Sequence, residues 1–207
     1  QVQAGDDPAR LALGEARERG LLIDLDCNAP FRAQIERLVD LQRIRDAGFH
    51  VAVDSMFGVG AGWFKDLLAG GKTTVSEIHG ERNPAFPGMT APEPIARNLG
   101  ALTDFIKQSG STVGLATDGD ADRLGIMDEN GVFVNQLQVF ALLCYYLLEV
   151  RGERGPIVKS LTTTRMANRL GEAYGVPVYE TAVGFKYLGP KMMETDAIIG
   201  GEESGGY

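Results

Sequence analysis

The chain has 207 residues, of which 44% are hydrophobic, and its formal net charge is −8. With a pI of about 4.8 and no long basic run, it is not expected to bind nucleic acid or an anionic membrane surface. It contains no apolar stretch long enough to span a membrane and no recognisable signal peptide. The two cysteines, Cys27 and Cys144, have neither metal-ligand nor disulfide-framework spacing, so we expect free thiols and a cytoplasmic location.

Residues 1–30 are polar and irregular, with one short helical patch at residues 11–19. We expect this segment to be a linker or the tail of a preceding domain. Because the chain starts at Gln1 rather than methionine, we also expect a processed or cloned fragment. Apolar residues at helical spacing from Phe31 to Ile44 then predict one helix that stops before Gly48.

The next segment alternates strands and helices. A buried strand is predicted at residues 50–54, a helix at 63–68 and a second strand at 74–78. Between the first two lie Gly58, Gly60 and Gly62, which resemble a phosphate-cradling loop only weakly. A tight strand-to-helix turn explains these glycines equally well, and we favour that interpretation.

A proline-rich loop at residues 84–94 precedes an amphipathic helix at 95–106. Further elements follow in chain order: strands at 113–116 and 124–127, a hairpin turn at 128–131, a returning strand at 132–134 and a largely buried helix at 138–150. This alternation is typical of a layered α/β domain.

Residues 151–156 form the best candidate for a domain boundary, because the strand and helix alternation restarts beyond them. Strands are expected at 157–160, 176–180 and 197–199, helices at 164–174 and 185–194, and a glycine-rich loop at 200–207. The predicted organisation is therefore a tail (1–30) and two successive three-layer α/β/α domains with mixed sheets (31–150 and 151–207), the second incomplete.

The most informative stretch follows the apolar residues 113–116. Asp118, Asp120 and Asp122 alternate there, and Arg123 closes the loop. Three convergent carboxylates form the hard oxygen donor set that Mg²⁺ prefers. Arg123 adds a permanently charged planar fork suited to phosphate oxygens. A divalent cation beside a phosphate-binding arginine indicates phosphoryl transfer.

Other interpretations of this loop stay open. A solvated acidic turn is one. A calcium loop would place Glu129 at its twelfth position, but Arg123 occupies the sixth, where the sharp bend requires glycine. An aspartyl phosphatase would use Asp118 as nucleophile and Asp120 as acid and base, although the residues after Asp120 do not fit that pattern. A non-catalytic sugar- or metal-binding module is a further alternative.

A second polar loop carries Glu202, Glu203 and Ser204 among glycines directly after an apolar strand. Such groups could bind the hydroxyls of a sugar, and a flexible terminal loop explains them equally well. Lys186 could neutralise an anion at the same face, although most lysines face water. The hydroxyls of residues 162–164 stand at a helix start, where capping is favoured over anion binding. His50 and His79 are isolated and are expected to be structural or exposed.

Several segments together resemble the α-D-phosphohexomutases, the family of phosphoglucomutases and phosphomannomutases. Residues 117–123 resemble the family's metal-binding loop, residues 201–205 its sugar-binding loop and residues 181–186 the segment before that loop. Residues 53–58 and 86–88 resemble parts of the family's second domain. The order and separation of the segments fit from about Phe31 onward.

The resemblance implies a four-domain enzyme of which this chain spans the second domain and part of the third. Asp118, Asp120 and Asp122 would hold Mg²⁺ together with a phosphoserine oxygen, and Arg123 would stabilise charge on the transferring phosphoryl group. Glu202, Ser204 and Lys186 would bind the substrate. The family transfers a phosphoryl group from serine to a hexose phosphate, glucose or mannose phosphate being favoured here, and passes through a bisphosphorylated sugar.

Three departures from the family pattern matter. No Thr-x-Ser-His-Asn-Pro-like loop with the nucleophilic serine occurs in the chain, and neither does the family's phosphate-binding C-terminal domain. Phe57 occupies the position where many relatives carry histidine, and the sequence does not indicate the effect of this difference. The resemblance therefore implies that the chain needs the missing N- and C-terminal domains, and that alone it binds Mg²⁺ weakly and catalyses nothing.

Overall fold

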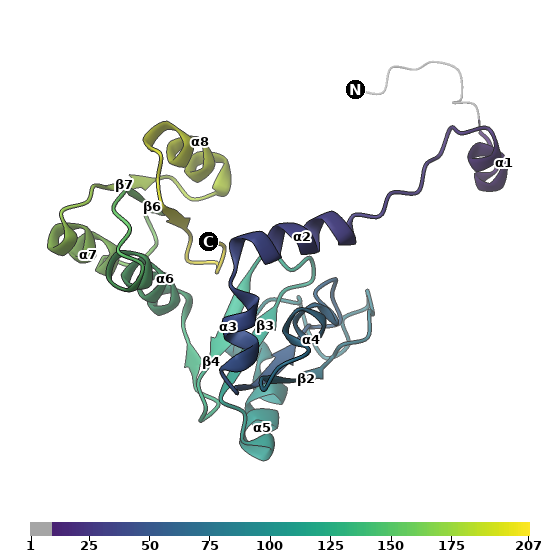
Figure 1. The fold of residues 1–207 in the computed structure, drawn as a ribbon, viewed down its shortest axis with the longest axis horizontal. Coiled ribbons are helices and arrows are strands. Elements are labelled where there is room, and N and C mark those ends of the chain that lie inside the picture. Colours follow the sequence, from purple (N-terminus) through teal and green to yellow (C-terminus); the bar gives the residue numbers. More distant parts are fainter. Residues whose placement is uncertain (1–9) are drawn as a thin grey trace. The chain divides into compact units, whose positions relative to one another are not determined.

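The structure is a computed structural model that describes residues 10–207. It divides into two compact units, Gln1–Asp40 and Leu41–Tyr207, and each is described by itself. The described part of the first unit contains two helices, α1 (Leu13–Glu18) and α2 (Asn28–Leu38), labelled in Figure 1. Helix α1 falls within the predicted helical patch, whereas residues 1–9 of the predicted tail lie outside the described residues.

The single helix predicted from Phe31 to Ile44 is wrong, because the chain forms two helices there. Helix α2 ends at Leu38, and α3 (Leu41–Asp46) begins after a break. Val39 within the break is extended, with φ −121° and ψ 130°. A β-branched valine is a weak helix former, and apolar spacing does not report where a helix is interrupted.

The first sheet of the second unit has five strands in the order β2-β1-β3-β4-β5. Strand β1 pairs in parallel with β2 and β3, whereas β4 pairs antiparallel with β3 and β5, so the sheet is mixed. The elements in chain order are β1 (His50–Asp54), α4 (Trp63–Leu68), β2 (Thr74–Ile78), the short 3₁₀ helix η1 (Ala96–Asn98), α5 (Gly100–Ser109), β3 (Val113–Thr117), β4 (Leu124–Met127) and β5 (Phe133–Val134).

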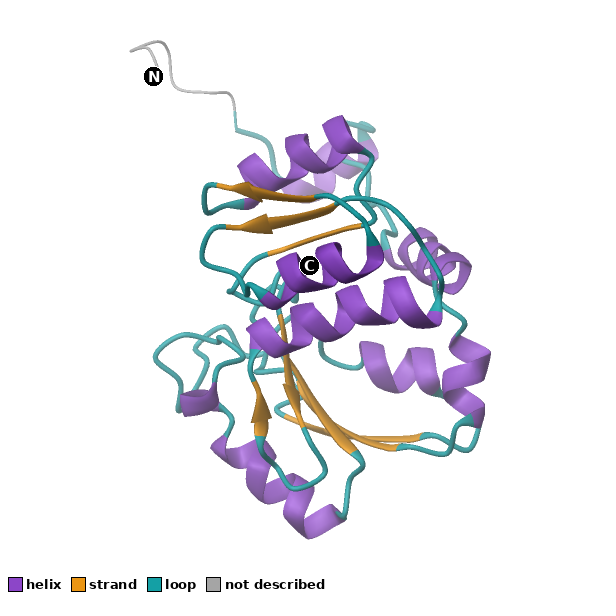
Figure 2. Ribbon diagram, turned by 90° about the vertical axis from the view of Figure 1, so that its left-hand side faces the viewer, coloured by secondary structure: helices purple, strands orange, loops and turns teal. Residues whose placement is uncertain are grey.

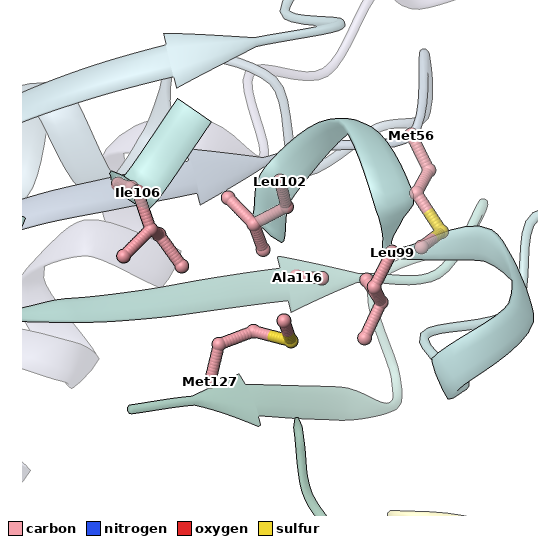
Figure 3. Close-up of a cluster of buried hydrophobic side chains, with 7 residues drawn as sticks. Met56, Leu99, Leu102, Ile106, Ala116 and Met127 are labelled. Carbon is pink, nitrogen blue, oxygen red and sulfur yellow. The ribbon is translucent and has the colours of Figure 1, made fainter. Parts of the chain in front are cut away.

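Helix α5 packs its apolar face against this sheet, as Figure 3 shows for the buried cluster. Leu102 and Ile106 are fully buried there, beside Ala116 of β3 and Met127 of β4. Gly114 of β3 allows the close approach, since a Cβ at this position would lie 2.4 Å from Ile106 Cδ1. Burial of each such large side chain stabilises the fold by about 1.5–3 kcal/mol, which fixes β3 and thereby the acidic loop that follows it.

The second sheet has three parallel strands in the order β7-β6-β8, and Figure 2 shows it as a set of strands separate from the first sheet. Its elements are α6 (Gln136–Tyr145), the π-helical turn η2 (Tyr146–Val150), β6 (Ile157–Ser160), α7 (Met166–Tyr174), β7 (Val178–Thr181), α8 (Phe185–Thr195) and β8 (Ile199–Gly201). The expected pair of α/β layered folds is therefore present, and the first sheet is mixed as predicted. The prediction of a mixed second sheet is wrong, because each of its strands is joined to the next through a helix, a crossover connection that keeps the strands parallel.

Helix α6 belongs with the second sheet by its packing. A reciprocal capping box of Asn135 and Gln138 starts the helix. Its buried residues Phe140 and Cys144 share one cluster with Ile157 of β6. We therefore propose that the second domain begins near residue 135, earlier than the boundary at residues 151–156 that the sequence suggested.

The two cysteines are free thiols. Cys27 is exposed, whereas Cys144 is buried in the α6 cluster, where burial raises its pKa to about 12. Across residues 10–207, no helix combines the length and the apolar character that crossing a membrane requires.

Candidate active site

The acidic loop, here called the metal loop (residues 118–123), connects β3 to β4. Its turn is closed by a hydrogen bond from Ala121 N–H to Asp118 O at 3.2 Å, with Ala121 at a left-handed φ of 62°. One carboxylate oxygen from each of Asp118, Asp120 and Asp122 lies within 4.8 Å of the others. Asp118 is 1% exposed, and the other two side chains are exposed. The structure thus brings together the three carboxylates that the sequence indicated as metal ligands.

Arg123 is fixed between two carboxylates. Its Nε donates to Asp118 Oδ2 at 2.6 Å, its backbone N–H donates to Asp118 Oδ1 at 3.0 Å, and its Nη1 lies 3.4 Å from Glu93 Oε1. Burial works to raise the pKa of the Asp118 carboxyl, but the hydrogen bonds and charge of Arg123 outweigh it, so this pKa lies below the usual value. Asp118 therefore stays ionised at neutral pH.

The donor set fits a divalent cation. Desolvation and the negative charges of Asp118 and Asp120 raise the pKa of Asp122, which means that the charged form of Asp122 is disfavoured by repulsion from its neighbours. A bound divalent cation would offset that repulsion. All three side chains offer oxygen, the ligand type that Mg²⁺ takes, and two of them remain open to solvent or substrate.

The second polar loop, here called the sugar loop (residues 201–205), follows β8. Glu202 is 8% exposed, and its Oε1 accepts a hydrogen bond from Gly184 N–H at 2.5 Å. Its other oxygen, Oε2, lies 3.4 Å from Ser204 Oγ. Gly201 is required for close packing, because a Cβ there would lie 2.5 Å from the Phe140 ring of α6. Helix α6 and the turn before α8 thus hold the loop in place.

The metal loop and the sugar loop line one cavity of about 530 Å³. Leu124 N–H, just after Arg123, donates to Gly205 O at 3.2 Å and joins the two loops directly. The residues that line the cavity are Asp120, Asp122, Arg123, Phe185, Glu202, Ser204, Gly206 and Tyr207. Carboxylates, an arginine and a hydroxyl from two different sheets therefore face a common space.

Lys186 is not brought to this cavity. It is exposed in the first turn of α8, and its Nζ lies 5.0 Å from the centre of the neighbouring Tyr187 ring. Phe185, one position earlier, lines the cavity instead. The helical rotation of about 100° per residue separates these two neighbours.

Glu203 has a role that the sequence did not indicate. Its Oε2 accepts hydrogen bonds from Ser160 Oγ at 2.9 Å and from Thr162 Oγ1. Burial opposes its charged form, but the Thr162 hydrogen bond and weaker ones outweigh this and lower the pKa of Glu203. Glu203 thus ties the sugar loop to the end of β6. The run of hydroxyl residues after a buried strand was the available signal.

The hydroxyl run at residues 162–164 is divided between two tasks. Thr164 Oγ1 accepts from Met166 N–H at 3.1 Å and so satisfies the first free amide of α7, although the N-cap residue itself is Arg165. Thr163 Oγ1 instead donates to Gly201 O at 3.3 Å and braces the sugar loop. Tyr207, also missed from the sequence, stacks on Phe140 and donates to Gln136 O at 2.9 Å.

Comparison with known proteins places these two folds in one family. The sequence profile described as phosphoglucomutase/phosphomannomutase, alpha/beta/alpha domain II, matches residues 29–131. The profile for alpha/beta/alpha domain III of the same family matches residues 135–207. Together the two profiles account for most of the chain, in the order in which the family carries them.

Two curated relatives are a phosphoglucomutase/phosphomannomutase of Thermococcus kodakarensis and a phosphoglucosamine mutase of Anoxybacillus flavithermus. The first is 30% identical over 94% of this chain and 41% of its own length. The second is 34% identical over 77% of this chain and 35% of its own length. The chain thus spans well under half of each of these relatives.

A crystal structure described as a phosphomannomutase from Thermus thermophilus is 35% identical, with a TM-score of 0.81 over 94% of this chain and 48% of that one. A phosphoglucomutase/phosphomannomutase family protein of Burkholderia thailandensis is 25% identical, with a TM-score of 0.69 over 80% of this chain and 37% of that one. The aspartyl-phosphatase and calcium-loop interpretations find no support in these matches. The chain therefore belongs to the phosphoglucomutase/phosphomannomutase family of α-D-phosphohexomutases, and it matches that family's second and third domains.

Proposed function

We propose that this chain provides the metal and sugar loops of a Mg²⁺-dependent phosphohexomutase. The reaction is the interconversion of hexose 1-phosphate and hexose 6-phosphate, with glucose or mannose as the sugar, through a phosphoserine enzyme and a hexose 1,6-bisphosphate. The observation that carries the proposal is that Asp120, Asp122 and Arg123 line the same cavity as Glu202 and Ser204. A phosphoryl group and a sugar hydroxyl could be held there side by side.

Each residue has a role that follows from its surroundings. Asp118, Asp120 and Asp122 would hold Mg²⁺, which when bound neutralises charge on phosphoryl oxygens. Arg123, kept charged and oriented by Asp118, would direct its remaining N–H groups to the phosphoryl group.

The sugar loop would do the positioning. Glu202 accepts from Gly184 N–H through Oε1 and keeps lone pairs for sugar hydroxyls. Ser204 can donate or accept beside it. Such groups at fixed positions favour reaction by orienting the hydroxyl that attacks.

We further propose that the 207-residue chain has no mutase activity by itself. No serine loop of the family's type occurs in its sequence, and the chain covers only 41% of its Thermococcus relative. The nucleophile and the site for the substrate's second phosphate would come from the flanking domains of the whole protein.

The whole protein tests the proposal. Purified with Mg²⁺, it should convert glucose 1-phosphate or mannose 1-phosphate to the 6-phosphate. Asp120→Asn should lower kcat by about 100-fold, because it removes one of three charged oxygens at the point where phosphoryl charge is stabilised. Asp104→Asn, an exposed carboxylate change on α5, is the matched control and should leave kcat unchanged.

Several results would contradict the proposal. Equal activity of Asp120→Asn and wild type would remove the metal loop from the reaction. Preference for glucosamine 6-phosphate over both neutral sugars would overturn the assigned substrate but not the mutase chemistry. Turnover by the purified 207-residue chain, free of contaminating enzyme, would overturn its predicted inactivity.

A further inference from the structure

The glycine turn between β1 and α4 (residues 55–62) has no place in the proposed chemistry, yet it lies against the metal loop. A Cβ on Gly58 would lie 2.6 Å from Gly119 O and 3.0 Å from Asp118 O. Val59 N–H donates to the same Gly119 oxygen at 3.1 Å. The φ of Gly58 is not positive, so the glycine is needed for this close approach rather than for its backbone conformation.

Gly60 makes a second close contact with the same region. A Cβ there would lie 2.6 Å from Thr117 Oγ1 and 3.4 Å from Ala121 Cβ. Thr117 is 7% exposed, and its Oγ1 has no hydrogen-bond partner within residues 10–207. This side chain therefore fills the space above Gly60 and leaves no room for a larger residue.

The opposite side of the metal loop is also covered. Gly119 N–H donates to Pro92 O at 3.2 Å, and a Cβ on Gly119 would lie 2.8 Å from Pro92 Cγ and 3.3 Å from Phe86 Cζ. The backbone between Asp118 and Asp120 is therefore held between the glycine turn and the proline-rich loop.

The glycine turn is itself held firmly at its start. Asp54 Oδ1 accepts from Met56 N–H at 2.9 Å and lies 2.9 Å from His79 Nδ1. Phe57 N–H donates to His79 O at 2.9 Å, and the two rings lie 4.4 Å apart. Met56, Phe57 and His79 all have left-handed φ values between 44° and 58°. Non-glycine residues keep such conformations only where their surroundings impose them.

The end of the turn is anchored to the same neighbouring strand. Glu77 of β2 accepts from Ser55 Oγ at 2.5 Å and from Gly62 N–H at 2.9 Å. Because Gly62 N–H already has a carboxylate partner, the turn is not arranged as a phosphate cradle. Its rigid part faces the metal loop instead.

We infer that the glycine turn positions the metal loop through close packing. Gly58 and Gly60 are then positioning residues that set the affinity of the metal loop for a divalent cation. The inference rests on the proposed metal site. Three carboxylates must converge to within a fraction of an ångström for tight binding, and residues that orient ligands typically change metal affinity by about 10–100-fold. An added methyl group at Gly58 or Gly60 would push the loop away from that arrangement.

The test is Mn²⁺ binding to the whole protein by isothermal titration calorimetry, with thermal unfolding as the control for folding. Gly58→Ala and Gly60→Ala should each lower Mn²⁺ affinity by about tenfold or more. Gly100→Ala is the matched control, since a Cβ there meets nothing within 4 Å. It should leave the affinity unchanged.

A rescue variant separates positioning from general damage. Thr117→Ala removes the Oγ1 that would contact the new methyl group of Gly60→Ala. The double variant should therefore bind Mn²⁺ to within about twofold of Thr117→Ala alone, which is a non-additive result expected only for groups in contact. Absence of rescue, or wild-type Mn²⁺ affinity in folded Gly58→Ala, would overturn the positioning role of the glycine turn and leave the metal site intact. No Mn²⁺ binding by the wild-type whole protein, which also carries the serine domain, would instead overturn the metal site itself, and with it the role of Gly58 and Gly60.

Discussion

Two neighbouring parallel strands of the first sheet carry an aspartate to the same edge. Strand β1 ends at Asp54, and β3, paired with it from Val51 to Asp54, leads through Thr117 to Asp118. Both carboxylates are almost fully buried, at 0% and 1% exposure. Burial alone therefore does not distinguish a structural carboxylate from a proposed metal ligand.

The partners of the two carboxylates make the difference. Both oxygens of Asp118 accept hydrogen bonds from Arg123, and its pKa is lowered despite burial. Asp54 is bonded only through Oδ1, and its Oδ2 has no hydrogen-bond partner in the described part of the chain. Burial dominates there and raises the pKa of Asp54. The proposed cation site thus combines converging carboxylates with an arginine that keeps Asp118 charged, whereas Asp54 is surrounded by a histidine and a backbone amide.

Metal affinity is where the two aspartates should differ most. Asp118→Asn removes a charged ligand and should weaken Mn²⁺ binding by about 100-fold or more, above the upper range for residues that only orient ligands. Asp54→Asn keeps the oxygen that fixes the glycine turn and should change affinity by less than about threefold. Calorimetric titration of both variants measures this ratio. Similar losses of Mn²⁺ affinity in both variants would mean that Asp118 and Asp54 do not differ in their contribution to metal binding.

Arg123 should account for the next largest effect. Arg123→Met removes the positively charged partner of Asp118 and leaves a buried carboxylate without compensation. Because the arginine side chain is 30% exposed, solvent screens part of the cost, and we expect a loss of about 1–2 kcal/mol in the free energy of unfolding at pH 7.

Urea unfolding of Arg123→Met, Asp118→Asn and the double variant completes a mutant cycle. The matched comparison is Arg97→Met, whose arginine pairs with Glu93 at the surface and should change stability by less than about 0.5 kcal/mol. Additive effects of the two loop substitutions would mean that Arg123 does not stabilise the charge on Asp118.

The sequence was informative about Asp118 and silent about Asp54 for a physical reason. Alternating carboxylates followed by an arginine form a short local pattern that indicates their chemistry, so the metal loop and its flanking strands could be predicted. The contacts of Asp54, Gly58 and Glu203 join residues that lie 25 to 61 positions apart, and no local pattern reports them. Lys186 illustrates the converse, since its position in the segment that resembles the family did not bring it to the cavity, which Phe185 lines instead.

The helices and strands follow the same rule, since local patterns predict them and contacts between distant residues are not visible in the sequence. The strands and most helices were predictable because apolar periodicity reflects a buried face. The break at Val39 could not be predicted, because it depends on where packing no longer supports a helix rather than on which residues are apolar. The start of the second domain depends on the contacts of α6, which only packing reveals.

The smallest effect, and the sharpest comparison, is the opposite pH dependence of the two aspartates. The raised pKa of Asp54 means that its contribution to stability is complete below the unfolded value of 3.8 and is lost as pH rises through the folded pKa. The lowered pKa of Asp118 means that its contribution is present above 3.8 and is lost only as pH falls through its folded pKa. Substitution by asparagine removes each contribution.

Between pH 4 and 7, Asp54→Asn should therefore gain stability relative to wild type, by on the order of 1 kcal/mol for each unit by which the folded pKa is raised. Asp118→Asn should show a constant difference from wild type above pH 5. The new amide has a cost of its own, but that cost does not vary with pH, so the slope alone is used.

Because His79 contacts Asp54, the series is repeated in a His79→Asn background, where asparagine tolerates the left-handed φ. Urea unfolding at each pH gives both slopes, and a flat difference for Asp54→Asn would mean that burial does not control its ionisation.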